Sequence, residues 1–185
     1  MKKVVLTFGL IAGGILGALM AIMVPYCLNN TASFESAEIF GYTIQVLAFI
    51  LVFFGVRSYR EHVGGGTISF GKAFKVGILT TLIACAVYVV AWEIIFWNFV
   101  PDFADKYAAH MLQTMHDKGA TAQAIEKATQ EMARFKVLYK NPFFNVGMTF
   151  VEVFPVGLIM TLISAAILRR KSPPGALSGA AAVAG

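Results

Sequence analysis

Four long runs of apolar residues, separated by polar segments, form the main pattern along this chain. The runs cover about residues 4–24, 39–56, 76–99 and 143–168. Each contains 18 or more residues and at most one charged side chain, which is enough helix to cross ~30 Å of hydrocarbon. A backbone without access to water must satisfy its own hydrogen bonds, so we expect these runs to be helices. The pattern predicts an all-α integral membrane four-helix bundle.

The segment between the third and fourth runs, about residues 102–140, has a helical pattern of its own. Asp102 and Thr121 are candidate N-caps for two helices, and Gly119 is a candidate stop between them. Apolar residues recur every three or four positions on both sides of Gly119, which is typical of amphipathic helices. We therefore expect an extracytoplasmic helical hairpin between the third and fourth transmembrane helices.

Composition agrees with a membrane protein and argues against a soluble domain. Hydrophobic residues make up 58% of the 185 residues and charged residues only 14%, with a mean hydropathy of +0.72. A soluble protein of this size has too small an interior to bury that much apolar surface. The formal net charge of +5 could suggest nucleic acid, but the placement of the charges favours a membrane surface instead.

Basic residues gather on one side of the predicted membrane. Nine of the 15 Lys and Arg residues lie at the N-terminus, between the second and third runs, and directly after the fourth run. The connection between the first and second runs has none. Short loops rich in Lys and Arg remain in the cytoplasm, whereas long translocated segments count for little. The distribution predicts that both termini are cytoplasmic and that the hairpin lies on the far side.

Several short motifs resemble a known family. They are 54–60 (FGVRSYR), 65–77 (GGTISFGKAFKVG), Trp92-Glu93, 101–103 (PDF), 141–142 (NP), 152–159 (EVFPVGLI) and 162–165 (LISA). In this order they resemble the bacterial membrane family catalogued as domain of unknown function 4199, from about the first helix to Lys171. The resemblance implies a multi-pass protein of the bacterial inner membrane. It implies no activity.

Polar side chains inside the predicted spans are the strongest candidates for a functional site. Glu93 lies ~9 Å and Glu152 ~13 Å from the outer end of its run, at ~1.5 Å per residue. Gln45 lies at a similar depth, and Tyr88 and Thr149 lie about one turn away. Carboxylates in hydrocarbon are costly and usually face a bundle interior. We expect these five side chains to gather in the outer half of the membrane.

Three interpretations of this cluster remain open. In the first, neutral Glu152 forms a polar clasp with neighbouring helices, each bond contributing ~1 kcal/mol. In the second, Glu152 is a proton or cation site, and in the third it contacts a partner. Pro155 frees a backbone carbonyl and is a candidate kink beside Glu152. Glu93 lies between Trp92 and Trp97, which are typical of an aromatic belt at the interface.

Small residues form lines on two of the predicted helices. Gly9, Gly13 and Gly17 recur every four residues in the first, and Gly77 belongs to a similar line in the third. Such lines allow two helices to approach closely. They serve either packing within the chain or a homo-oligomer, and the sequence does not decide between these uses.

No catalytic, cofactor or metal motif emerges from the sequence. We therefore expect one domain over residues 1–171, with a disordered cytoplasmic tail at 172–185, acting as a non-enzymatic structural or accessory membrane subunit. Its partners would be the lipid bilayer and either a second copy or another membrane protein, contacted through the hairpin or the small-residue faces, with no nucleic acid. The alternative function is a small proton- or cation-coupled transporter or channel that uses the intramembrane carboxylates.

Overall fold

The structure is a computed structural model that describes residues 1–29 and 34–170. Its helices are α1 (Lys2–Asn29), α2 (Phe34–His62), α3 (Phe70–Asn98), α4 (Phe103–Asp117), α5 (Ala122–Tyr139) and α6 (Pro142–Leu168). Over the described ranges there is no β-strand, only one isolated bridge between Ile68 and Arg170. The predicted all-α fold is confirmed at this level. The predicted tail at 172–185 lies outside the described residues.

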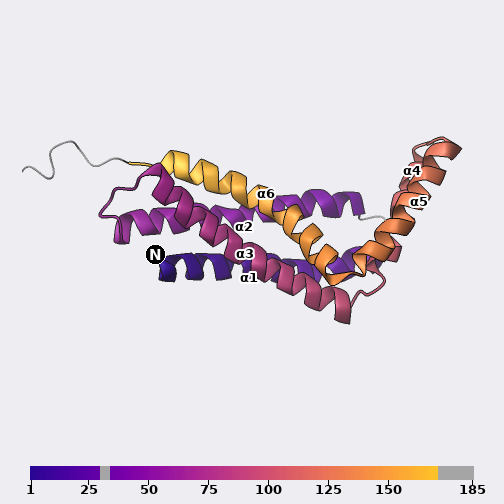
Figure 1. Ribbon diagram of the computed structural model, residues 1–185, viewed down its shortest axis with the longest axis horizontal. Coiled ribbons are helices and arrows are strands. Elements are labelled where there is room, and N and C mark those ends of the chain that lie inside the picture. Colours follow the sequence, from indigo (N-terminus) through magenta and orange to yellow (C-terminus); the bar gives the residue numbers. More distant parts are fainter. Residues whose placement is uncertain (30–33, 171–185) are drawn as a thin grey trace, which may run out of the picture.

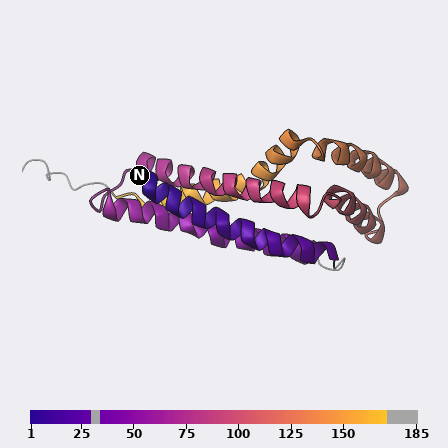
Figure 2. The same cartoon turned by 90° about the horizontal axis from the view of Figure 1, so that it is seen from below.

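Four of these helices, α1, α2, α3 and α6, are long and apolar enough to cross a membrane. They lie side by side along the long axis of the molecule, while α4 and α5 project from one end (Figures 1 and 2). Helix α1 packs against α2 and α3, and α6 packs against the same two helices. Each long helix therefore buries one side against its neighbours and leaves an apolar surface on the outside.

Helices α1 and α2 extend beyond the apolar runs at both ends and α3 at its start, so the predicted bounds are too short there, whereas α6 matches its run to within one residue. Helix α1 continues through Pro25 to Asn29, and α2 continues past Val56 to His62. Within that last stretch the Arg57 guanidinium pairs with the Glu61 carboxylate one turn away, at 3.0 Å, a spacing that supports helix. Hydropathy marks only the part of a helix that suits hydrocarbon, whereas backbone hydrogen bonding continues into polar surroundings.

The end of the molecule opposite α4 and α5 is closed by contacts between the α2–α3 connection and the chain after α6. Ile68 and Arg170 exchange two backbone hydrogen bonds of 3.0 and 2.9 Å. Arg60 also donates from Nη1 to the carbonyl of Leu168 at 3.5 Å. Ser69 caps α3 by accepting from the backbone N–H of Lys72. The N-terminus, this connection and the end of α6 thus lie at one end (Figure 1).

Helices α4 and α5 pack on each other and turn back at Gly119, which has a φ of +72°. Thr121 caps α5 as predicted, accepting from the backbone N–H of Ala124. The predicted cap at Asp102 is wrong in its detail, because its side chain accepts no backbone hydrogen bond. Asp102 instead pairs with the Lys106 ammonium at 2.9 Å, which satisfies the carboxylate but leaves the helix end uncapped.

An aromatic cluster attaches the α4–α5 pair to the long helices. Its members are Phe96 of α3, Phe103 of α4, and Phe135 and Tyr139 of α5, and the ring of Tyr139 lies 4.9–6.1 Å from the other three. Tyr139 is buried, and burial raises the pKa of its phenol. Offset and edge-to-face rings at these distances attract beyond their area burial. The base of the α4–α5 pair is therefore fixed in position.

Candidate functional site

Three of the five predicted polar residues come together where α2, α3 and α6 meet. Tyr88 Oη and Gln45 Nε2 each donate to Glu152 Oε1 at 3.5 Å. Gln45 is only 4% exposed, and its Oε1 is buried without a hydrogen-bond partner. Glu152 itself is exposed at the outer surface of the helices. The group links three helices through long hydrogen bonds, which are at the limit of useful geometry.

Thr149 belongs to a second polar group that the sequence reasoning missed. Its hydroxyl donates to the Asn145 carbonyl one turn earlier, at 2.9 Å. Asn145 is fully buried and accepts from Trp92 Nε1 at 2.8 Å, while its amide donates to the carbonyl of Tyr139 at 3.3 Å. An asparagine inside an apolar run, four residues before Thr149, is a signal that could have predicted this group.

Glu93 is separate from the Glu152 group. Its Oε2 accepts from Trp97 Nε1 on the next turn of α3, at 2.8 Å. Its Oε1 is buried without a partner. Trp97 is exposed, as expected of an aromatic belt, but Trp92 is buried, so the belt interpretation is wrong for Trp92. The predicted depth of Glu93 along its helix gave no information about which side of α3 the carboxylate occupies.

Hydroxyl groups continue the polar line of α6 toward the opposite end of the molecule. Thr81 of α3 and Thr161 of α6 share a hydrogen bond of 2.9 Å, and Thr81 also donates to the carbonyl of Gly157. Ser164 donates to the carbonyl of Met160. Thr81, Thr161 and Ser164 are all fully buried. Thr81 and Thr161 thus satisfy each other between α3 and α6, and Ser164 is satisfied within α6.

The predicted small-residue lines lie between helices of this chain. A Cβ on Gly9, Gly13 or Gly17 would come within 3 Å of α3 side chains, namely those of Ile83, Val87 and Ala91 respectively. A Cβ on Gly77 would lie 2.9 Å from Thr161. These glycines therefore face intramolecular contacts, in which they allow close approach. They are not available to a second copy in this arrangement.

Pro155 lies inside α6, and the helix continues on both sides of it. Its place, three residues after Glu152, leaves the carbonyl of Val151 without the usual intrahelical donor. Two residues later, Gly157 lies against Thr81 and the ring of Phe49. The kink proposed for this point stays a prediction, but α6 packs tightly against α2 and α3 directly after it.

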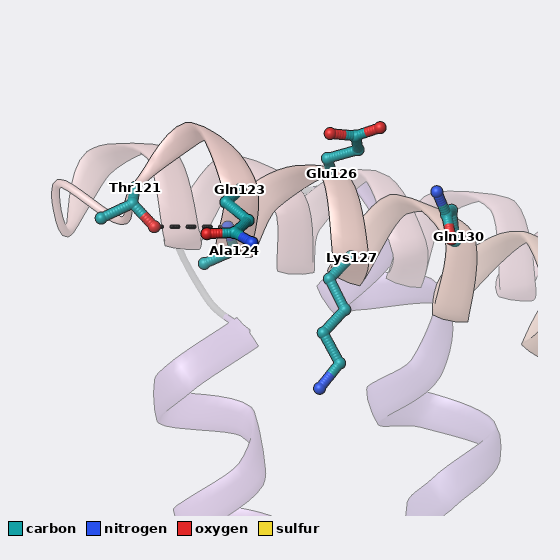
Figure 3. A pocket seen from close by; sticks show the side chains of 6 residues that line it. All are labelled: Thr121, Gln123, Ala124, Glu126, Lys127 and Gln130. Carbon is teal, nitrogen blue, oxygen red and sulfur yellow. Dashed lines mark hydrogen bonds between the residues drawn. The ribbon is translucent and has the colours of Figure 1, made fainter.

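A surface hollow near the start of α5 is lined by residues of that helix and its cap alone. They are Thr121, Gln123, Ala124, Glu126, Lys127 and Gln130. Figure 3 shows Glu126 and Lys127 pointing to opposite sides of the helix. A hollow built by one exposed helix encloses no ligand. In the described part of the chain, no group of three or more His, Cys, Asp or Glu side chains could hold a metal ion.

Comparisons with known proteins give a family but no characterised relative. Neither the curated proteins nor the solved structures contain a match to this chain. A family model matches residues 7–170, which include all of the site residues described above. The chain belongs to this family, described as protein of unknown function (DUF4199).

Proposed function

We propose that the chain is a multi-pass protein of the bacterial inner membrane that acts as a non-enzymatic structural or accessory subunit. In this proposal α1, α2, α3 and α6 form a four-helix transmembrane bundle with both termini in the cytoplasm. The α4–α5 pair is an extracytoplasmic hairpin that contacts a partner. The proposal rests on four apolar helices of spanning length and on basic residues concentrated at the end that carries the N-terminus.

The observation that carries the accessory role is the form of the α4–α5 pair. It is fixed at its base by the aromatic cluster, yet α4 buries only Ala104 and Ala108, and α5 buries only Tyr139. Most of its surface is therefore open. A well-anchored projection that buries so little of itself is suited to contact with another protein, because its geometry is set before binding and less order is lost.

Crosslinking in cells tests this role. A photoreactive amino acid at Gln130, on the exposed surface of α5, should give a discrete adduct of higher mass. The same group at Leu10, on the exposed apolar surface of α1, is the matched control and should give none. Tyr139→Ala should abolish the Gln130 adduct, because the base of the pair is then released. If the protein with the photoreactive group at Gln130 gave no adduct, an accessory role through the α4–α5 pair would be contradicted.

The alternative, a proton- or cation-coupled transporter or channel, needs a hydrated route from Glu152 to the opposite end of the bundle. Thr81, Thr161 and Ser164 lie in that direction, but they are fully buried and hydrogen-bonded. This observation favours packing over transport. Proton uptake into liposomes by the wild-type protein, above that of Glu152→Gln, would instead favour the alternative.

A further inference from the structure

Glu152 is an exposed carboxylate within a helix of spanning length. It belongs to α6, whose most apolar stretch qualifies as a membrane span, and it lies at the surface rather than inside the group of helices. Ionisable side chains at this depth are costly and normally face a bundle interior or pair with another group. Its exposure on the outside of the bundle therefore calls for a partner that lies beyond the surface of this chain.

The oxygen atoms around Glu152 lack donors. Tyr88 and Gln45 each reach only Oε1, and each at 3.5 Å. Among the described residues no donor reaches Oε2. Gln45 is 4% exposed, its amide nitrogen points at Glu152, and its Oε1 has no partner although it is fully buried. The exposed carboxylate of Glu152 therefore has one oxygen without a donor and one with only long hydrogen bonds, and a donor that carries positive charge would complement it.

A second copy of this chain, lying alongside in the same orientation, cannot supply a positively charged donor to Glu152. The four apolar runs contain no Lys, Arg or His. A parallel homodimer would place apolar side chains, or a second Glu152, against the first. Lys and Arg offer several N–H donors and no acceptor, so they complement the exposed carboxylate of Glu152. The complementary group must therefore come from another protein.

The surface around Glu152 fits an apolar helix. Met148 and Ile159, one and two turns away on α6, are exposed, and so are Tyr42 and Val46 beside Gln45 on α2. Helices α2 and α6 pack against each other here. An apolar face broken by a single acidic group is complementary to an apolar helix broken by a single basic group.

We propose that Glu152 and Gln45 form the docking point for a membrane-spanning helix of another protein, which carries a Lys or Arg in its outer half. The proposal rests on the accessory role and names the chemistry of one partner contact. It is separate from the contact made by the α4–α5 pair, because the docking point lies within the spans.

Model helices in liposomes test this docking point with purified full-length protein. The two probes are single-span peptides of about 20 apolar residues with uncharged polar ends, identical except for one Lys or one Leu in the outer half. Energy transfer from the protein's tryptophans to a dansyl group on the peptide reports association. The wild-type protein should bind the Lys peptide about tenfold more tightly than the Leu peptide.

Variants assign that preference to its residues. Glu152→Gln should remove the preference, and the matched control Glu93→Gln should retain it, because Glu93 already bonds to Trp97. Gln45→Met should weaken the preference and serves as the decisive variant if Glu152→Gln does not melt cooperatively. Equal binding of both peptides by the wild type, or a preference that survives Glu152→Gln, would overturn the proposal.

Two further outcomes distinguish related explanations. If sodium ions raise the melting temperature of the wild type but not of Glu152→Gln, and neither peptide is preferred, the group is a small-cation site and the proposal is wrong. The peptide assay contains no natural partner, so it is independent of the Gln130 crosslinks. A failure of the α4–α5 contact and a failure of this docking point are therefore distinguishable.

Discussion

At the scale of single residues, Gly157 lies where α6 packs tightly against both α2 and α3. A Cβ at this position would lie 2.4 Å from Thr81 of α3 and 2.8 Å from the ring of Phe49 of α2. The buried side chains of Thr81 and Phe49 leave no room for a methyl group. The sequence could not show this, because a glycine in an apolar run has the same appearance whether it faces lipid or a neighbouring helix.

Gly157→Ala should therefore destabilise the protein by about 1–3 kcal/mol, the usual cost of overpacking a filled site. The measurement is thermal melting in one detergent at neutral pH. Gly147→Ala on the same helix is the matched control, because nothing lies within 4 Å of its added Cβ, and it should melt at or slightly above the wild-type temperature. Equal melting of the two variants would show that α6 does not approach α2 and α3 as described.

Asn145 is a fully buried polar residue whose Oδ1 accepts from Trp92 Nε1 and whose Nδ2 donates to the carbonyl of Tyr139. Asn145→Ala should cost about 1–3 kcal/mol, because it leaves the buried Trp92 N–H without an acceptor. Melting temperatures report the change. Asn98→Ala removes an exposed side chain that donates only to the Ile94 carbonyl, and we expect little effect from it. A similar loss from both substitutions would argue against the Trp92–Asn145 hydrogen bond.

At the scale of helices, the sequence predicted which elements exist better than where they end or which way they face. The four apolar runs and the two amphipathic helices are all present, and Gly119 and Thr121 have the predicted roles. For the site, depth correctly grouped Glu152 with Gln45 and Tyr88. The same reasoning from depth wrongly placed Glu93 and Thr149 in that group. Residues at one depth can face different neighbours, and only helix packing sets the direction of each side chain.

The aromatic cluster makes the position of the α4–α5 pair depend on Tyr139. Tyr139→Ala should remove three ring contacts and cost about 3–5 kcal/mol, as for other buried aromatic truncations. The loss should appear as faster proteolysis within α4 and α5 while α1, α2, α3 and α6 stay protected. Leu138→Ala, an exposed neighbour, is the control. Unchanged cleavage in Tyr139→Ala would mean that the pair is attached in another way.

An ion pair between α4 and α5 gives this part of the molecule a dependence on pH. The Lys136 ammonium lies 2.9 Å from Asp105 and lowers the pKa of that carboxyl. Because the folded pKa is below the unfolded value of about 3.9, the contribution is complete above that value. It is lost as the pH falls through the folded pKa.

The corresponding prediction compares wild type with Lys136→Gln. Amide protection in α4 should be higher in the wild type at neutral pH, and the difference should disappear in strong acid. The effect should be small, because the side chains of Lys136 and Asp105 are 38% and 53% exposed and their attraction is screened by solvent. Lys127→Gln is the control, since Lys127 pairs only within α5, with Glu131 at 3.9 Å. A difference that persists in strong acid would exclude the Asp105–Lys136 pair as its cause.

At the scale of the whole molecule, the two ends differ in character. One end carries the N-terminus, the α2–α3 connection and the end of α6, joined by the Ile68–Arg170 bridge. The other carries the α4–α5 pair (Figure 2). Among the described residues near the first end, most charged side chains are Lys or Arg, whereas α4 and α5 carry mixed charge. This asymmetry supports the proposed orientation in the membrane.

Cysteine accessibility tests this orientation most directly. In a background with Cys27 and Cys85 replaced by Ala, Gln130→Cys places a thiol on α5, and Val63→Cys places one in the α2–α3 connection. A membrane-impermeant maleimide is applied to intact spheroplasts and again after permeabilisation. Gln130→Cys should react in intact spheroplasts, and Val63→Cys only after permeabilisation. The reverse pattern, or reaction of both thiols in intact spheroplasts, would contradict a four-span protein with its α4–α5 pair outside.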